Sequence, residues 1–285
     1  MPFTTLISAS ELQTLFAQGL PLKVFDCTAD LTQPEAGYAQ FLLGHVPTAM
    51  HASLDHDLSA HAADTAASGG RHPLPSRERF AQWLSRVGLQ PGTQVVVYDR
   101  NGLNFCVRLW WMLKWMGHEA VAVLDGGLQA WTAAGGALAQ GPAELPQSCA
   151  AWPLTAPLQQ LVTAEEVLAN RPSMTLLDAR APARYRGEVE PLDPVAGHIP
   201  GALNRPFGSN LGDDGHFKSP AQLRQEFDVL LAGRDPASVV HYCGSGVSAL
   251  PNLLAMTVAG YAPTRLFAGS WSEWCRDPQR PVERG

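Results

Sequence analysis

The feature that most constrains the fold of this 285-residue chain is an internal repeat. Four segments of the first half return in the same order in the second half: KVFDC (23–27) as TLLDA (175–179), GHVPTA (44–49) as GHIPGA (197–202), QVVVYD (94–99) as SVVHYC (238–243), and DGGLQAW (125–131) as AGSWSEW (268–274). The offsets between the matched segments are 152, 153, 144 and 143 residues. Similarity at a nearly constant offset indicates that the chain holds two copies of one domain.

The boundary between the two copies is predicted in segment 141–157, GPAELPQSCAAWPLTAP. This segment holds four prolines and no periodic apolar face, a composition typical of an extended linker. We therefore expect an N-terminal domain over residues 1–140 and a C-terminal domain over residues 158–285.

Within each half, short β-branched runs alternate with helical patterns, which predicts an α/β fold with a mainly parallel sheet flanked by helices. One run ends at Asp99 and its repeat ends at Cys243, and apolar residues at the helical period follow both. In such sheets ligands bind beyond the carboxyl ends of the strands. These two strand-to-helix loops are therefore the first places to search for a site.

Charge and composition exclude several classes of partner. The formal net charge of −6 does not favour nucleic acid or an anionic membrane, and we expect neither as a partner. The first residues lack the basic start and apolar core of a signal peptide, and no apolar run is long enough to span a membrane. Five cysteines, an odd number without a C-x-x-C pair, favour a reducing compartment. We expect a cytoplasmic protein.

The second loop, CGSGVS (243–248), carries the only nucleophile of the two loops, because the first copy has Asp99 in place of a cysteine. Cys243 is expected at the end of a strand and before a helix, where backbone N–H groups and the helix dipole stabilise an anion at the sulfur. The hydroxyls of Ser245 and Ser248 add hydrogen-bond donors, and Ser248 stands where a helix N-cap is expected.

The remaining cysteines and the histidines are interpreted as structural. Cys27, Cys106, Cys149 and Cys275 are expected in a strand, a helix, the linker and the C-terminal tail, without a loop of this kind. Histidines at positions 45, 51, 56, 61 and 72 have spacings that fit no standard metal site. We expect no metal.

The chain resembles the two-domain rhodanese family, and within it the 3-mercaptopyruvate sulfurtransferases. The resemblance rests on the paired GHVPTA and GHIPGA segments, LDGGLQAW, GSWSEW and above all CGSGVSA. It implies two tandem rhodanese-like α/β domains, an inactive N-terminal copy and a catalytic C-terminal copy. Thiosulfate-preferring rhodaneses typically carry basic residues just after the cysteine, whereas the small neutral CGSGV loop is of the mercaptopyruvate type. Ser248 stands where that type usually has threonine.

The resemblance also implies a substrate-binding arginine. Relatives bind the substrate carboxylate with an arginine in a segment like RYRG (184–187), which assigns this role to Arg184, and Gly244, Gly246 and Val247 belong to the substrate-binding loop. A guanidinium suits a carboxylate because it donates two parallel hydrogen bonds. Some relatives carry a second such arginine shortly afterwards, but the chain continues EVEPLD (188–193). Arg186 is the candidate substitute.

Two residues of the N-terminal domain match positions that the family is proposed to use in acid–base or serine-protease-like relays. They are His72, in RHPLP (71–75), and Asp57. His72 is expected either to assist proton transfer or to line the interdomain cleft.

The expected reaction is a double displacement. Cys243 takes the sulfur of 3-mercaptopyruvate as a persulfide and passes it to a thiol or cyanide, with a thioredoxin-like protein among the acceptors, and no cofactor takes part. The alternatives are a thiosulfate:cyanide sulfurtransferase and a non-catalytic sulfur carrier or binding module. A tyrosine-phosphatase-like or arsenate-reductase-like enzyme is unlikely, because such enzymes need an arginine about six positions after the cysteine, where this chain has Ala249.

Overall fold

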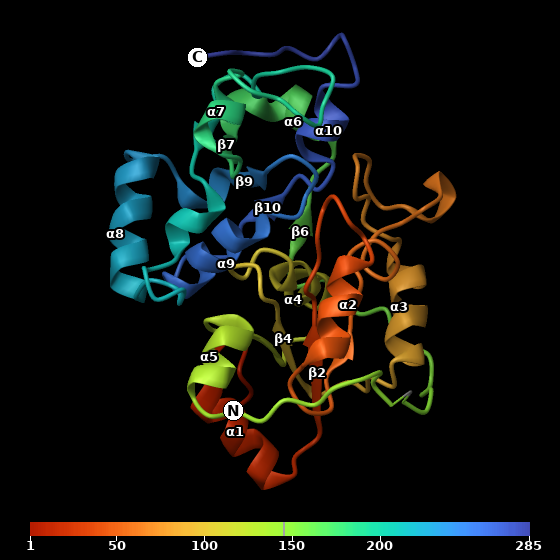
Figure 1. Ribbon diagram of the computed structural model, residues 1–285. Helices are drawn as coiled ribbons and strands as arrows, with labels where there is room; N and C mark the ends of the chain where they lie inside the picture. Colours follow the sequence, from red (N-terminus) through yellow and green to blue (C-terminus); the bar gives the residue numbers. More distant parts are fainter. Residues whose placement is uncertain (145) are drawn as a thin grey trace. The chain divides into compact units, whose positions relative to one another are not determined.

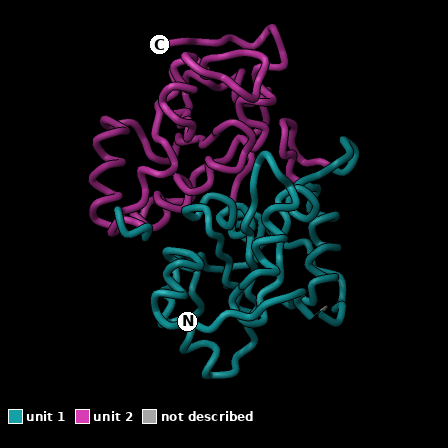
Figure 2. Tube along the Cα trace, in the orientation of Figure 1, with its two compact units in different colours: residues 1–65, 75–158, 213–216 teal, residues 66–74, 159–212, 217–285 magenta. Residues whose placement is uncertain are grey.

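The computed structural model describes residues 1–144 and 146–285. Its contacts divide the chain into two compact units (Figure 2). Unit 1 comprises residues 1–65, 75–158 and 213–216, and unit 2 comprises residues 66–74, 159–212 and 217–285. Each unit therefore contains one short segment that is distant in sequence from the rest of it.

Unit 1 is built on a five-stranded sheet in which every pair of neighbours is parallel (Figure 1). In spatial order its strands are β1 (Leu6–Ile7), β5 (Val121–Leu124), β4 (Gln94–Tyr98), β2 (Leu22–Asp26) and β3 (Met50–His51). Its helices are α1 (Ala9–Gln18), α2 (Ala36–Leu43), α3 (Arg77–Arg86), α4 (Cys106–Trp115) and α5 (Gly127–Ala133), with a 3-10 turn at Ala63–Thr65.

Unit 2 repeats this plan with its own five-stranded parallel sheet. In spatial order its strands are β6 (Gln160–Leu161), β10 (Arg265–Leu266), β9 (Val239–Tyr242), β7 (Thr175–Asp178) and β8 (Leu203–Asn204). Its helices are α6 (Ala164–Asn170), α7 (Pro182–Tyr185), α8 (Pro220–Leu231), α9 (Leu250–Val258) and α10 (Ser270–Trp274), with 3-10 turns at Arg171–Ser173, Phe207–Asn210 and Pro236–Ser238.

The two sheets have the same strand order, and this confirms the predicted α/β fold with two copies of one domain. The inner strands are largely apolar and buried: every residue of β9 is buried, His241 included, and so is all of β4 except its first residue. Such runs are expected of parallel strands that are covered by helices on both faces.

Capping residues explain why the first helix of each copy begins where it does. The Ser8 hydroxyl accepts the N–H of Glu11, whose carboxylate in turn accepts the N–H of Ser8. Thr163 and Glu166 form the same reciprocal pair at the start of α6. Each reciprocal pair, known as a capping box, satisfies N–H groups that a helix N-terminus otherwise leaves unpaired.

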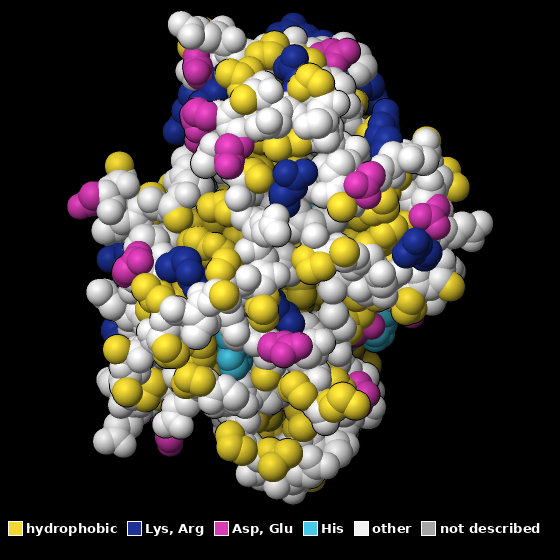
Figure 3. All heavy atoms as spheres, turned by 180° about the vertical axis from the view of Figure 1, so that it is seen from behind, with side chains coloured by type: hydrophobic (Ala, Val, Ile, Leu, Met, Phe, Trp, Pro, Cys, Tyr) yellow, Lys and Arg dark blue, Asp and Glu magenta, His cyan; other side chains and the backbone are white. Residues whose placement is uncertain are grey.

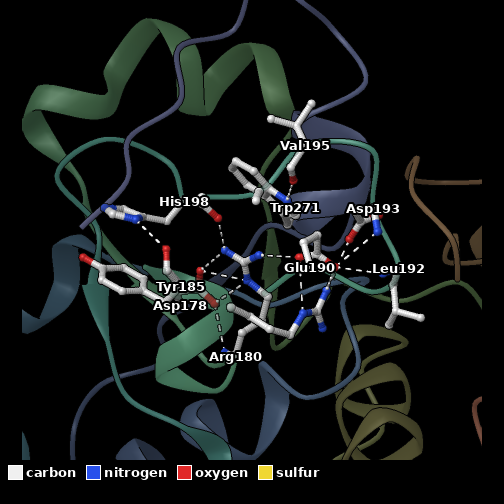
Figure 4. Close-up of polar contacts among 12 residues, drawn as sticks. Asp178, Arg180, Tyr185, Glu190, Leu192, Asp193, Val195, His198 and Trp271 are labelled. Atoms are coloured by element: carbon white, nitrogen blue, oxygen red, sulfur yellow. Dashed lines mark hydrogen bonds and ion pairs between the residues drawn. The ribbon is translucent and has the colours of Figure 1, made fainter. Parts of the chain in front are cut away.

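The repeated GHVP and GHIP segments have a structural role in both copies. The His45 ring stacks on Phe41 with 3.9 Å between centroids, and its Nδ1 lies 3.0 Å from the Phe41 carbonyl oxygen. His198 stacks on Tyr185 at 3.8 Å, with Nδ1 2.8 Å from the Tyr185 carbonyl oxygen (Figure 4). These histidines therefore hold the chain that precedes the short strands β3 and β8.

No helix in the described part of the chain is long and apolar enough to cross a membrane. On the face drawn in Figure 3, basic and acidic side chains are interspersed rather than gathered by sign.

Candidate active site

Cys243 lies directly after β9, and only 2% of the residue is exposed. β9 pairs with β10 on one side and with β7 on the other, so the carboxyl end of this strand is held from both sides. The cysteine therefore begins its loop at the edge of the sheet where ligands of α/β proteins bind.

The loop backbone is fixed by the first turn of α10. The N–H of Cys243 donates to the Ser270 hydroxyl at 3.1 Å, and the Cys243 carbonyl accepts the N–H of Trp271 at 3.0 Å. The carbonyl of Gly244 accepts the N–H of Ser272 at 2.8 Å. These three bonds hold the polar backbone groups around the sulfur in one arrangement.

Gly246 is required by the shape of the loop. Its φ is +75°, and a Cβ atom there would lie 2.1 Å from the carbonyl oxygen of Ala268. Only glycine fits a left-handed residue so close to another backbone. The following Val247 is 2% exposed and anchors the loop in the interior.

The prediction that Ser248 caps the following helix is wrong. α9 begins at Leu250, its cap position is Ala249, and no side chain caps it. Residues 248 and 249 form a turn between Val247 and α9, so the helix begins one residue later than a cap at Ser248 would require.

Ser245 lies against a histidine from the first half of the sequence. The Nδ1 atom of His72 is 2.8 Å from the Ser245 hydroxyl oxygen, and Ser245 is 6% exposed. His72 belongs to segment Ala66–Leu74, the part of the first half that is packed into unit 2 (Figure 2). We call this segment the arm.

The arm is held by α10. The Arg71 N–H donates to the Ser272 hydroxyl at 3.0 Å. A Cβ atom at Gly69 would lie 2.6 Å from the carboxyl carbon of Glu273, and one at Gly70, whose φ is +89°, would lie 2.5 Å from the carbonyl oxygen of Gly269. The two glycines therefore let the arm approach α10 closely enough for this bond to form.

Arg184, on α7, belongs to a network of alternating charges. Its guanidinium donates from Nε and Nη2 to the two oxygens of Glu190 at 3.2 and 2.7 Å, and Nη2 lies 3.4 Å from Asp193. Figure 4 shows Glu190 also facing Arg180, which pairs with Asp178 at 2.7 Å. The two carboxylates thus fix the plane of the Arg184 guanidinium.

The ionisation of Glu190 follows from this network. Burial alone would raise the pKa of Glu190, but hydrogen bonds from Arg184 and from the N–H groups of Leu192 and Asp193 lower it below its ordinary value. Glu190 is therefore ionised at neutral pH and compensates charge on both Arg180 and Arg184.

The guanidinium of Arg184 lies beside the residue that follows Cys243. A Cβ atom at Gly244 would lie 3.4 Å from Arg184 Nη1 and 3.2 Å from Arg71 Nη2. The absence of a side chain at Gly244 therefore leaves room next to the cysteine, and two guanidinium groups border that room.

Two predicted residues lie elsewhere. Arg186 pairs with Glu188 at 2.7 Å, and both side chains are about half exposed. Asp57 belongs to unit 1, where its carboxylate accepts the N–H of Ser53 at 2.9 Å. Within unit 2, the structure thus brings Ser245 and His72 together and places Arg184 at the cysteine loop, whereas Arg186 pairs with Glu188.

Comparison with known proteins gives the family. The family model for the rhodanese-like domain matches residues 8–134 and 163–277, one match in each copy. The chain belongs to the rhodanese family. It is a tandem rhodanese-domain sulfurtransferase.

Its relatives include two bacterial proteins with provisional names. A Pseudomonas aeruginosa protein, named as a 3-mercaptopyruvate sulfurtransferase, is 45% identical over 100% of both chains. SseB of Mycobacterium tuberculosis, named as a thiosulfate sulfurtransferase, is 44% identical over 98% of this chain and 97% of its own.

Two solved structures resemble this chain closely. The 3-mercaptopyruvate sulfurtransferase from Leishmania major has a TM-score of 0.83 at 30% identity and covers 98% of this chain and 76% of its own. SseA from Escherichia coli has a TM-score of 0.77 at 30% identity and covers 95% of this chain and 100% of its own.

In the first rhodanese domain, the loop that matches the cysteine loop is filled by its own carboxylate. One oxygen of Asp99 accepts the N–H groups of Asn101 and Leu103 at 2.8 and 2.9 Å, and the other accepts those of Phe105 and Cys106 at 2.8 and 2.9 Å. The rhodanese loop is therefore a cradle for an anion, and in this copy aspartate occupies it permanently.

Three other cysteines of this rhodanese are buried. Burial raises the pKa of the Cys27, Cys106 and Cys275 thiols above its ordinary value, which favours the protonated thiol over the thiolate. Cys27 follows β2 directly, Cys106 is the first residue of α4, and Cys275 follows α10.

Two residues at the cysteine loop, Arg71 and Ser270, were not predicted from the sequence. The internal repeat contains a signal for Ser270, because it aligns Ser270 with a glycine, Gly127. A serine in place of a glycine suggests a left-handed residue kept for its side chain, and the φ values are indeed +56° for Ser270 and +61° for Gly127. No sequence signal pointed to Arg71, because the arm packs into unit 2 through contacts with residues that are distant in the chain.

Proposed function

We propose that this rhodanese transfers sulfur from 3-mercaptopyruvate to a thiol through a persulfide on Cys243. The observation that supports this donor is the guanidinium of Arg184 beside Gly244, the residue next to Cys243 in the chain. A guanidinium held in a fixed plane suits a carboxylate, and 3-mercaptopyruvate carries its carboxylate at the opposite end from its sulfur.

The proposed reaction has two displacements. The Cys243 thiolate attacks the sulfur of the donor, an S–S bond forms, and the C–S bond breaks. Its electron pair goes to the carbon that becomes the methyl group of pyruvate, through the enolate, which then takes one proton. The outer sulfur keeps its own proton or loses it to solvent. A thiolate acceptor attacks this outer sulfur, becomes a persulfide itself and frees the Cys243 thiolate.

We assign the proton transfer to the Ser245 hydroxyl and His72, which lie 2.8 Å apart. A serine hydroxyl can pass a proton to the enolate while histidine replaces it, since histidine exchanges protons near neutral pH. Participation of Asp57 remains a prediction from the resemblance, and stabilisation of the sulfur by Ser248 remains a prediction from the loop sequence.

Thiosulfate is the second candidate donor. A relative of comparable identity is named for it, and the guanidinium groups of Arg71 and Arg184 border the space at Gly244. The sequence alone suggested that this loop lacks a cation for a dianion, but the structure supplies two from outside the loop. We therefore expect the preference between the two donors to depend on how well the shape of each anion matches these guanidinium groups.

For the acceptor we propose a small thiol or a thioredoxin-like dithiol, with cyanide as a test acceptor. A reducing compartment such as the cytoplasm suits this chemistry, because the Cys243 thiol must be free, and all five cysteines are free in the structure.

The first test is direct detection of the intermediate. Incubation with mercaptopyruvate alone should add about 32 Da, one sulfur atom, to the peptide that carries Cys243. Cys243→Ser should show neither the adduct nor turnover, and Cys149→Ser, at the partly exposed cysteine of unit 1, is the matched control that should keep both. An adduct without transfer to any thiol would instead favour a sulfur carrier.

The second test compares donors with one acceptor. We expect kcat/KM for mercaptopyruvate to exceed that for thiosulfate by about tenfold or more, because a planar carboxylate accepts two parallel hydrogen bonds from a guanidinium and the tetrahedral end of thiosulfate fits that fork less well. The opposite ratio would overturn the proposed donor and leave the family unchanged.

A further inference from the structure

Gly244 is not required by the backbone conformation of the cysteine loop. Unlike Gly246, it does not adopt a left-handed φ, and the atoms nearest to a Cβ built on it are side-chain nitrogens of Arg71 and Arg184. A larger residue at position 244 would therefore meet side-chain ends rather than backbone. The glycine serves the space beside Cys243 rather than the shape of the loop.

The first copy carries an arginine at the matching position, Arg100, directly after Asp99. Arg100 reaches the end of the neighbouring strand β2, where its Nη2 atom lies 3.3 Å from the Asp26 carboxylate and donates to the carbonyl oxygen of Gly44. Asp26 is the last residue of β2 and is fully buried. A buried carboxylate is costly unless a cation compensates it, so Arg100 has a structural task in unit 1.

In the second copy a different arginine binds the matching groups. The repeat aligns Asp26 with Asp178 and Gly44 with Gly197. Arg180 donates from Nη2 to the Asp178 carboxylate and to the carbonyl oxygen of Gly197, both at 2.7 Å. Its Nε lies 3.1 Å from both oxygens of Asp178, and Figure 4 shows this pair. The same pair of acceptors therefore receives a guanidinium in both copies, from different places in the chain.

Arg180 is aligned with Thr28 in the repeat. The backbone is the same at the two positions, because each N–H donates to the Oδ1 atom of the aspartate two residues earlier at 2.9 Å. Only the side chains differ. The pair Thr28 and Arg100 of the first copy thus corresponds to the pair Arg180 and Gly244 of the second.

Arg180 also contacts two groups that shape the site. Its Nη1 pairs with Glu190 at 3.3 Å, and Glu190 in turn holds Arg184. Its guanidinium lies 4.8 Å from the centroid of the Trp271 ring, and the Trp271 N–H donates to the carbonyl of Cys243. The Arg180 side chain is only 2% exposed, so it holds these groups from the interior of unit 2.

We propose that Arg180 is a positioning residue that keeps the space beside Cys243 open. It supplies, from the loop after β7, the guanidinium that the first copy takes from Arg100, and position 244 is therefore free to be glycine. The proposal rests on the proposed function only in taking Cys243 as the nucleophile, and it does not depend on which donor the enzyme prefers.

A cycle of two substitutions tests whether the two positions can exchange the structural task. Arg180→Thr leaves the buried Asp178 without its guanidinium and should lower the melting temperature by about 10 °C or more. Gly244→Arg alone should also lower it, because Arg180 already occupies Asp178 and a third guanidinium is added beside two others. In the Arg180→Thr background, Gly244→Arg should instead raise the melting temperature by about 5 °C or more, since the added side chain can reach Asp178.

Activity separates the positioning role from the structural one. The double variant should regain stability but not activity, because the side chain at position 244 begins in the space beside Cys243 and Glu190 has lost one of its two arginines. We expect its kcat/KM to stay about a hundredfold or more below wild type with both mercaptopyruvate and thiosulfate. A rescued double variant with wild-type kinetics would overturn the proposal, because the place of the guanidinium would then not matter to the site.

Gly208→Arg is the matched control, because Gly208 is exposed, has no left-handed φ, and has no atom within 4 Å of its Cβ position. It should neither change the kinetics nor raise the melting temperature of Arg180→Thr. The melting temperatures involve no donor, so this part of the test stands even if the proposed donor is wrong.

The reverse cycle in the first copy covers the case in which Arg180→Thr does not fold. Arg100→Gly should lower the melting temperature, and Thr28→Arg should raise it again in that background by about 5 °C or more. A double variant that melts no higher than its single parent, in either copy, would overturn the proposal, because the two positions would then not share one task.

Discussion

Ser270 occupies a left-handed backbone conformation that its repeat partner, Gly127, adopts without a side chain. The φ values are +56° and +61°, and such a conformation costs a residue with a Cβ about 1–2 kcal/mol. Strain of this kind is commonly kept where a side chain is needed. Here the Ser270 hydroxyl accepts the N–H of Cys243 and donates to the carbonyl of Phe267 at 3.0 Å.

Two substitutions separate the effect of backbone strain on stability from the effect of the Ser270 hydroxyl. Ser270→Ala loses the hydrogen bonds and should lower the free energy of unfolding by about 1–3 kcal/mol. Ser270→Gly loses them too but relieves the strain, and should therefore be more stable than Ser270→Ala by about 1 kcal/mol. Both should lower kcat by about ten- to a hundredfold, because the cysteine backbone is no longer held in place. Urea unfolding and steady-state kinetics measure the two effects.

The control is Ser238→Ala, which removes a hydroxyl that donates to Thr175 at 2.9 Å at the opposite end of β9. It should lose stability without losing activity. Full activity in Ser270→Gly would show that the hydroxyl does not position Cys243.

At the scale of elements, the inner strands and the long helices could be predicted from the sequence, whereas the short elements could not. β4 is apolar after its first residue and β9 is apolar except for His241, which is close to the pattern of a covered parallel strand. β3 and β8 have two residues each, and α7 has four. Such elements carry no periodicity and are fixed by tertiary contacts, as with the stacked histidines before β3 and β8.

The buried histidine of β9 gives a prediction about pH. His241 is fully buried, its Nε2 lies 2.9 Å from the Thr264 hydroxyl, and burial lowers the pKa of His241 from 6.5 to about 3. Because the pKa is lower in the folded state, the unfolded state binds the proton first as pH falls. Stability should therefore be complete above about pH 6.5 and decline toward pH 3 by up to about 1.4 kcal/mol per pH unit.

His241→Gln keeps a hydrogen-bonding side chain but does not titrate, so its free energy of unfolding should fall less steeply between about pH 6.5 and 4.5. His56→Gln is the control, because the His56 side chain is 63% exposed and its removal should leave the slope unchanged. Urea unfolding at several pH values measures this. Parallel curves for wild type and His241→Gln would show that another group controls the pH dependence.

At the scale of the whole molecule, the sequence repeat indicates two copies of one domain. It does not show that a short loop of each half belongs to the unit built mainly from the other half, which we call the exchange. The loop before α3 belongs to unit 2, and the loop before α8 belongs to unit 1. The contacts are equivalent as well: Gly70 lies against Gly269 at the start of α10, and His216 lies against Gly126 at the start of α5. Sequence similarity locates the two loops, but it cannot show which unit each one packs into, because that depends on contacts distant in the chain.

We predict that activity depends on whether the arm can approach α10, and Gly70 tests this in the full chain. Gly70 has a φ of +89°, and a Cβ atom would lie 2.5 Å from the carbonyl oxygen of Gly269. Gly92 in unit 1 has a similar φ of +83° with no atom within 4 Å of its Cβ position. Alanine at either position should cost about 1–2 kcal/mol of backbone strain.

Only Gly70→Ala should also displace the arm, and with it Arg71 and His72. We expect its kcat/KM to fall by about tenfold or more, with a melting temperature within a few degrees of Gly92→Ala. Gly92→Ala should keep wild-type kinetics. Matching kinetics in the two variants would mean that the site tolerates a displaced arm. A much lower melting temperature in Gly70→Ala alone would mean that the arm stabilises the second unit as well as completing its active site.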